Sequence, residues 1–114
     1  MSKMVTIYHG HFQVQVNPSK LYLLKIPQLK KLFKMLGNPQ ELGRNHESRA
    51  TIHCMLLQQQ VLAKTDFNKA NQELAQDQEN KELRREVNRA RQAYERARKI
   101  TIYMREYAYE GQTS

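Results

Sequence analysis

Apolar and polar positions alternate near the start of the chain. Residues 4–8 are mostly β-branched or aromatic, and in residues 12–16 every second position is apolar. A period of two is typical of a strand with one buried face. Gly10 lies between the two runs and takes positive φ at little cost. We therefore predict a β-hairpin over residues 4–16.

Residues 21–26 are mostly apolar and fit either a third strand or the start of a helix. The Asn-Pro-Ser sequence at residues 17–19 is a turn signal that separates this run from the hairpin. Pro27 biases the residue before it towards an extended conformation. That bias favours a strand, so we predict a small antiparallel sheet to which residues 21–26 add a third strand.

Residues 27–36 have the pattern of a short amphipathic helix. Pro27 suits the first helical position, and the Gly-Asn-Pro sequence at residues 37–39 ends the helix. Apolar side chains fall on one face and lysines on the other. The apolar face consists of Leu29, Leu32, Phe33 and Leu36, and the basic face consists of Lys30, Lys31 and Lys34.

The second part of the chain contains two long helical stripes of apolar positions. Asn45 is a suitable N-cap, and no Gly or Pro follows it until Gly111. The first stripe ends near residue 74, and nothing apolar occurs in residues 77–81. From residue 83 to 108 apolar positions recur every three or four residues, as in a heptad seam. We predict a long, coiled-coil-like antiparallel helical hairpin over residues 45–110, with its turn near residues 77–81.

Together these elements predict an α+β fold. The 114 residues are enough for one core, so we expect a single domain over residues 1–114. In it, residues 1–44 would form the sheet and the short basic helix, followed by the hairpin. Residues 100–103 are β-branched and aromatic, which makes a strand the alternative there. Because no Gly or Pro precedes them, we favour continued helix.

The net charge of +8 is unevenly distributed along the chain. Residues 1–40 contain six lysines and no acid, and the predicted C-terminal helix is rich in arginine. Such asymmetry indicates a polyanionic partner such as DNA or RNA, although many basic proteins bind neither.

Four arginines occupy one edge of the predicted C-terminal helix at intervals of seven residues. Each interval corresponds to a rise of about 10.5 Å. In a structural interpretation, the first two pair across the hairpin with acids, Asp66 with Arg91 and Glu73 with Arg84. The four arginines are Arg84, Arg91, Arg98 and Arg105.

In a functional interpretation, the bases at the open end of the hairpin bind an anionic partner, because guanidinium groups bind phosphate with two donors. The tyrosines near the C-terminus could stack on bases, anchor a protein interface, or pack in the core. The candidate binding residues are Lys30, Lys31, Lys34, Arg96, Arg98, Lys99, Tyr103, Arg105 and Tyr107.

Cys54 is the only cysteine, which excludes an internal disulfide and fits a reducing compartment. It lies in an apolar stretch, so we expect a small core residue. Its neighbour His53 would point about 100° away on a helix, which argues against a catalytic thiol. No apolar run is long enough to span a bilayer, and the first residues have no secretion signal. We therefore expect a cytoplasmic protein without a membrane partner.

The sequence has no motif of a known catalytic site. A Gly-rich phosphate loop, HExxH, CxxC and a nucleophile elbow are all missing. His9 and His11 share one side of the predicted strand, but no cysteine or carboxylate lies near them to complete a metal site. We expect no metal, no cofactor and no enzyme activity.

Two function classes remain after these exclusions. The leading hypothesis is a non-enzymatic nucleic-acid-binding or regulatory protein. The alternative is a protein-interaction module that docks through the hairpin, such as an inhibitor or adaptor of a nucleic-acid-handling protein of viral or mobile-element type. A homodimer, in which two hairpins pair into a four-helix bundle, is a further expectation.

Overall fold

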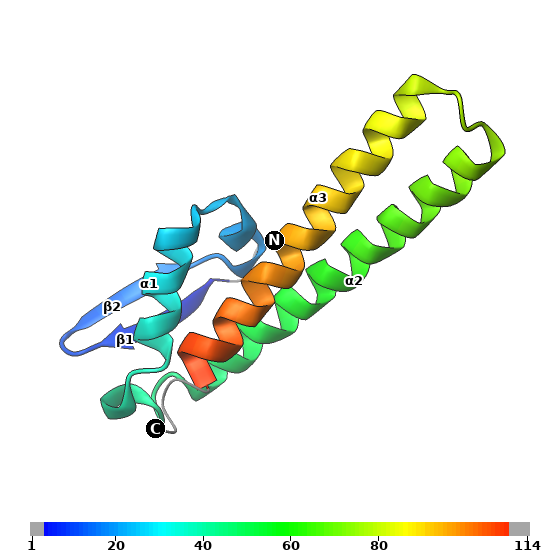
Figure 1. Cartoon of the computed structure of the whole chain (residues 1–114). Helices are drawn as coiled ribbons and strands as arrows, with labels where there is room; N and C mark the ends of the chain where they lie inside the picture. The colour runs from blue at the N-terminus through cyan, green and yellow to red at the C-terminus, as the bar shows by residue number, and fades with distance from the viewer. Residues whose placement is uncertain (1–3, 110–114) are drawn as a thin grey trace.

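The fold is α+β, with a small sheet and a short helix packed at one end of a long helical hairpin (Figure 1). The computed structural model describes residues 4–109. Residue 110, the predicted end of the hairpin, lies outside the described residues. The elements are β1 (Val5–His9), β2 (Phe12–Val16), the 3-10 helix η1 (Pro18–Leu23), α1 (Ile26–Leu36), the 3-10 turn η2 (Pro39–Glu41), α2 (His46–Gln76), α3 (Lys81–Met104) and the π-helical turn η3 (Arg105–Tyr109).

Strands β1 and β2 form the predicted hairpin. They are antiparallel, and Val5 pairs with Val16 at the open end. Gly10 lies in the turn with a φ of 62°, a left-handed conformation that costs glycine little. Val5 and Ile7 are buried on one face of β1, which is the period of two that the sequence displays.

The predicted third strand is wrong, because residues 18–23 form the 3-10 helix η1. Asn17 starts this helix by accepting a hydrogen bond from the Ser19 backbone N–H, and Pro18 occupies its first position. Leu24 and Lys25 are extended but pair with no strand in the described part of the chain, and Ile26, which Pro27 was expected to bias towards an extended conformation, is instead the first residue of α1. The capping signal at Asn17 therefore outweighs the apolar run that follows it.

Side chains from the start of α2 bind the edge of β1 where a third strand would lie. Asn45 Oδ1 accepts a hydrogen bond from Tyr8 N at 2.8 Å, and Asn45 Nδ2 donates one to Tyr8 O at 3.0 Å. The Ser48 hydroxyl donates to Thr6 O. Asn45 does occupy the predicted N-cap position, but its side chain makes no capping bond because it is committed to β1. These side chains satisfy partly buried backbone groups at the free edge of β1.

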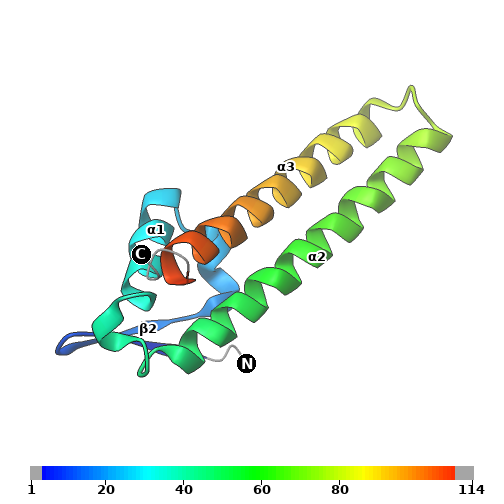
Figure 2. The same cartoon turned by 60° about the horizontal axis from the view of Figure 1, so that its bottom comes forward.

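Helices α2 and α3 form the predicted antiparallel hairpin, whose closed end projects away from the sheet (Figure 2). The turn between them falls at residues 77–80, and Asn80 caps α3 by accepting bonds from Glu82 N and Leu83 N. Residues 100–103 are helical, so the strand alternative is wrong. The Phe67 and Tyr94 rings stack across the hairpin with centroids 6.2 Å apart.

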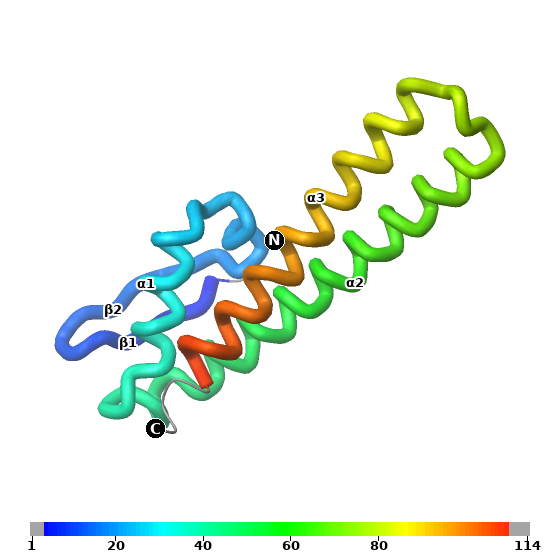
Figure 3. The backbone as a smooth tube through the Cα atoms, in the orientation of Figure 1, coloured from blue at the N-terminus to red at the C-terminus, as the bar shows by residue number. Residues whose placement is uncertain are grey.

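The hydrophobic core lies at the base of the hairpin, where β1, α1 and the open ends of α2 and α3 meet (Figure 3). It includes every residue of the predicted apolar face of α1. Ile52 and Leu56 contribute from α2. The prediction that Cys54 is a core residue is wrong, since its side chain is exposed. It lies two residues beyond Ile52 and so points about 160° away from the core-facing side of the helix.

Candidate nucleic-acid interface

One exposed edge of α3, continued into η3, carries a row of four arginines, which we call the arginine ladder: Arg84, Arg91 and Arg98 in α3 and Arg105 at the start of η3. All four side chains are exposed. Intervals of two helical turns separate them by about 10.5 Å each, so the row spans about 31 Å. None of the four forms an ion pair with a described residue.

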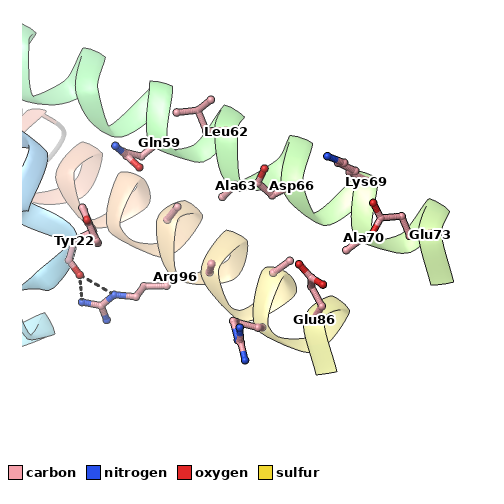
Figure 4. Close-up of a pocket in the computed structure, with 14 residues that line it drawn as sticks. Tyr22, Gln59, Leu62, Ala63, Asp66, Lys69, Ala70, Glu73, Glu86 and Arg96 are labelled. Carbon is pink, nitrogen blue, oxygen red and sulfur yellow. Dashed lines mark hydrogen bonds between the residues drawn. The ribbon is translucent and has the colours of Figure 1, made fainter. Parts of the chain in front are cut away.

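A groove of about 730 Å³ runs between α2 and α3 on one side of the hairpin (Figure 4), and we call it the hairpin groove. Alanines from both helices lie along it, and Leu62 stands at its edge. Its charged lining residues are Asp66, Lys69, Glu73, Glu86, Arg89 and Arg96, and its alanines are Ala63, Ala70, Ala90, Ala93 and Ala97. The one signal for this groove in the sequence is the small residues in the heptad seam, from which no groove was predicted.

The predicted ion pairs across the hairpin are wrong, because neither Asp66–Arg91 nor Glu73–Arg84 forms. Arg84 Nε donates to Gln78 O at 2.9 Å, and Arg91 Nη2 donates to Asn88 Oδ1 at 3.2 Å.

The reason is that the acids and the ladder lie on different sides of the hairpin. Asp66 and Glu73 line the hairpin groove, whereas the ladder does not. Arg89 also lines the groove, and Arg91 lies two residues further on, about 160° around α3. The predicted register placed partners at the same level along the hairpin without fixing the side on which each one projects.

The structure brings the lysines of α1 next to two of the predicted tyrosines. Lys30 Nζ lies 4.7 Å from the centroid of the Tyr103 ring, and Lys34 Nζ lies 5.4 Å from that of Tyr107. Both tyrosines are partly buried and pack against the core. These cation–π contacts help to hold α1 against the end of α3. The geometry favours core packing for the tyrosines over stacking on bases, since a lysine covers each ring.

Arg96, a predicted binding residue, is committed to holding two segments of the chain together. Its Nε and Nη2 donate to Tyr22 O at 3.2 and 2.8 Å (Figure 4), and Nη2 also donates to Leu24 O. These bonds join the end of η1 to α3. The sequence pattern could not reveal this role because the two carbonyls lie more than 70 residues away in a segment whose backbone conformation was predicted wrongly.

Apart from Arg96, the predicted binding residues therefore divide between two surfaces. Lys99 and Tyr103 are one turn apart and share the side of α3 that faces α1. Arg105 lies two residues after Tyr103, about 160° around the helix. We call Lys30, Lys31, Lys34 and Lys99 the lysine face; it points in a different direction from the arginine ladder.

Tyr109 belongs to a third group, between η3 and α2. Its ring centroid lies 5.3 Å from that of His53 and 5.3 Å from Arg49 Cζ. Burial raises the pKa of Tyr109, and the positive charge of Arg49 partly offsets this effect. The tyrosine packs η3 against α2 and is part of neither basic surface.

The described residues also bear on metal binding and on membrane insertion. In residues 4–109 no three His, Cys, Asp or Glu side chains are grouped so that they could hold a metal ion. His9 and His11 are exposed on the β-hairpin. None of the described helices is both long enough and apolar enough to cross a membrane.

Comparison with known proteins adds no further constraint. No protein-family model matches the chain, and neither the curated proteins nor the solved structures include a significant match.

Proposed function

We propose that the protein binds nucleic acid by contacts between the arginine ladder and phosphate groups. The observation that carries this proposal is that four exposed, evenly spaced arginines form no ion pair with a described residue. A hairpin that used these arginines for its own stability would place acids opposite them. The acids of α2 that lie level with the ladder, Asp66 and Glu73, instead line the hairpin groove.

The length and chemistry of the ladder suit a nucleic-acid backbone. Duplex DNA carries one negative charge per roughly 1.7 Å of helix axis, so the ladder's span of about 31 Å lies alongside on the order of eighteen phosphates. Guanidinium groups bind phosphate oxygens with paired N–H donors. Phosphate contacts fix position but read no sequence, so this mode of binding is independent of base sequence.

One acid lies beside the ladder and opposes its potential. Glu95 follows Arg91 by four residues and precedes Arg98 by three, which places it on the same side of α3. It forms no ion pair with a described residue. The lysine face is a second basic surface, but Lys30 and Lys34 are already engaged with tyrosine rings. The ladder is therefore the stronger candidate for phosphate binding.

A matched pair of substitutions tests the proposal. Arg91→Gln removes a ladder charge, and Arg89→Gln removes a charge from the same helix on the groove side. Affinity for labelled duplex DNA and single-stranded RNA would be measured by fluorescence anisotropy over a range of salt concentrations. Loss of one phosphate contact makes the negative slope of log affinity against log salt shallower by about 0.9 on duplex DNA. Arg91→Gln should make the slope shallower by this amount, and Arg89→Gln should leave it unchanged. Equal effects of the two substitutions would contradict the proposal.

A second candidate function is a protein-interaction module that docks through α2. The observation that favours it is a stretch of α2, residues 50–63, that contains no Lys, Arg, Asp or Glu and carries exposed apolar side chains as well as the buried Ile52 and Leu56. Within it Leu57 is 44% exposed and Val61 is 64% exposed. Binding anchored by such side chains responds to their substitution and changes little with salt. A partner lost on Leu57→Ser but retained when ladder arginines become Gln would favour this candidate.

A further inference from the structure

The part of the hairpin beyond the base, residues 57–99, has very little core of its own. Ala70, which is 6% exposed, is the one buried side chain between Leu57 and Lys99. Most of the stability of helices in folded proteins comes from packing of an apolar face against other elements. Packing against a further partner would therefore stabilise this part of α2 and α3 more than it would stabilise the base of the hairpin.

The hairpin groove is lined by small side chains and can accommodate another helix. Its alanines let another helix approach closely, since the distance between packed helices depends on the side chains at the contact. Leu62 stands at the edge of the groove with 59% of its surface exposed. The volume of about 730 Å³ extends over both helices of the hairpin (Figure 4).

The charges of the groove identify the partner that fits it. The groove contains the acids Asp66, Glu73 and Glu86 and the bases Lys69 and Arg89, and none of these forms an ion pair with a described residue. Its remaining base is Arg96, whose guanidinium already binds backbone carbonyls. The charges of this surface thus nearly balance, on a chain whose net charge is +8.

We propose that the hairpin groove seats the hairpin of a second copy of this chain, forming a four-helix bundle. In a two-fold dimer the same surface meets itself, so the acids of one copy can face the bases of the other. A strongly acidic or strongly basic partner would leave one sign of charge unmatched. Elsewhere, two copies of so basic a chain repel each other, and this repulsion is smallest where the charges balance.

The area available is adequate for a stable dimer. A hairpin face about 30 Å long and about 20 Å wide has a projected area on the order of 600 Å². Stable interfaces bury about 800 Å² of accessible surface per partner, and side-chain relief makes accessible area larger than its projection. The arginine ladder lies on the other side of the hairpin from the groove, so this dimer would carry one ladder on each outer side.

The test is the oligomeric state of the full chain by sedimentation velocity over a range of concentrations. The unaltered protein should change from monomer to dimer as concentration rises. Ala93 is exposed and lines the groove, so Ala93→Arg should give a monomer where the unaltered protein is a dimer. Ala75 is an exposed alanine of α2 outside the groove, so Ala75→Arg makes the same chemical change and should leave the dimer intact.

Two outcomes would overturn the proposal: a monomer at all concentrations, or equal dimerisation of the Ala93→Arg and Ala75→Arg variants. If circular dichroism shows that the Ala93→Arg variant does not fold, Leu62→Gln replaces it as the test variant. This substitution should raise the dissociation constant of the dimer about tenfold or more. Because a dimer stabilises only the folded state, the thermal midpoint of the unaltered protein should also rise with concentration. A constant midpoint would overturn the proposal independently of any substitution.

Discussion

Replacement of Arg96 separates a structural arginine from the ladder arginines that we propose bind phosphate. Arg96→Gln removes three hydrogen bonds to Tyr22 O and Leu24 O. A hydrogen bond from a charged donor contributes about 1.5–3 kcal/mol, but these groups are partly exposed and water replaces much of the interaction. We expect the free energy of unfolding to fall by about 1–3 kcal/mol in total.

The assay is urea and thermal unfolding followed by far-UV circular dichroism. For a domain of this size the thermal midpoint falls by about 4 °C for each kcal/mol lost. The control is Arg98→Gln, two residues further on, where the side chain is exposed and makes no ion pair with a described residue. It should change stability by less than about 0.5 kcal/mol. Equal stability of the two variants would refute the role assigned to Arg96.

Three further substitutions test the bonds of Asn45 to β1, the packing of α1 against η3, and the effect of the acid beside the ladder. Asn45→Ala should cost about 2–4 kcal/mol in urea unfolding, because it leaves Tyr8 N and O without the bonds that Asn45 makes; a loss below 0.5 kcal/mol, roughly the effect of a neutral surface change, would contradict this. Gly37→Ala should lower the thermal midpoint, because a Cβ there would meet Tyr107 O and lie 3.0 Å from Ala108 Cα; an unchanged midpoint would mean that α1 and η3 are less closely packed. Glu95→Gln should raise DNA affinity roughly twofold by anisotropy, since it removes the acid beside the ladder; a fall in affinity would count against binding at that surface.

The elements that sequence patterning predicted correctly are those determined by local signals. The heptad seam and the polar break at residues 77–81 are enough to define α2 and α3, and Asn80 supplies the cap. Gly10 and the alternation around it define the β-hairpin. The apolar face of α1 follows directly from helical spacing. In each case the interactions that decide the structure lie within a few residues of one another.

The predictions that were wrong depend on contacts between distant segments. The edge of β1 is bonded by Asn45 and Ser48, a pairing that no periodicity in the sequence encodes. Likewise, the sequence does not reveal the carbonyl partners of Arg96, because they lie at the end of η1, where a strand was predicted. The predicted ion pairs required knowing on which side of α2 Asp66 projects, which depends on how the two helices are rotated about their axes.

If the arginine ladder binds nucleic-acid phosphates, as we propose, the salt dependence of binding must come largely from these four residues. The variant in which all four ladder arginines become Gln should be compared with a variant of equal net charge in which Lys20, Lys31, Lys81 and Lys99, all exposed, become Gln. For duplex DNA, four phosphate contacts contribute about −3.6 to the slope of log affinity against log salt. We predict that this contribution disappears in the ladder variant and persists in the lysine variant. The same slope in both variants, or an affinity of the unaltered protein that does not depend on salt, would show that the ladder does not bind phosphate.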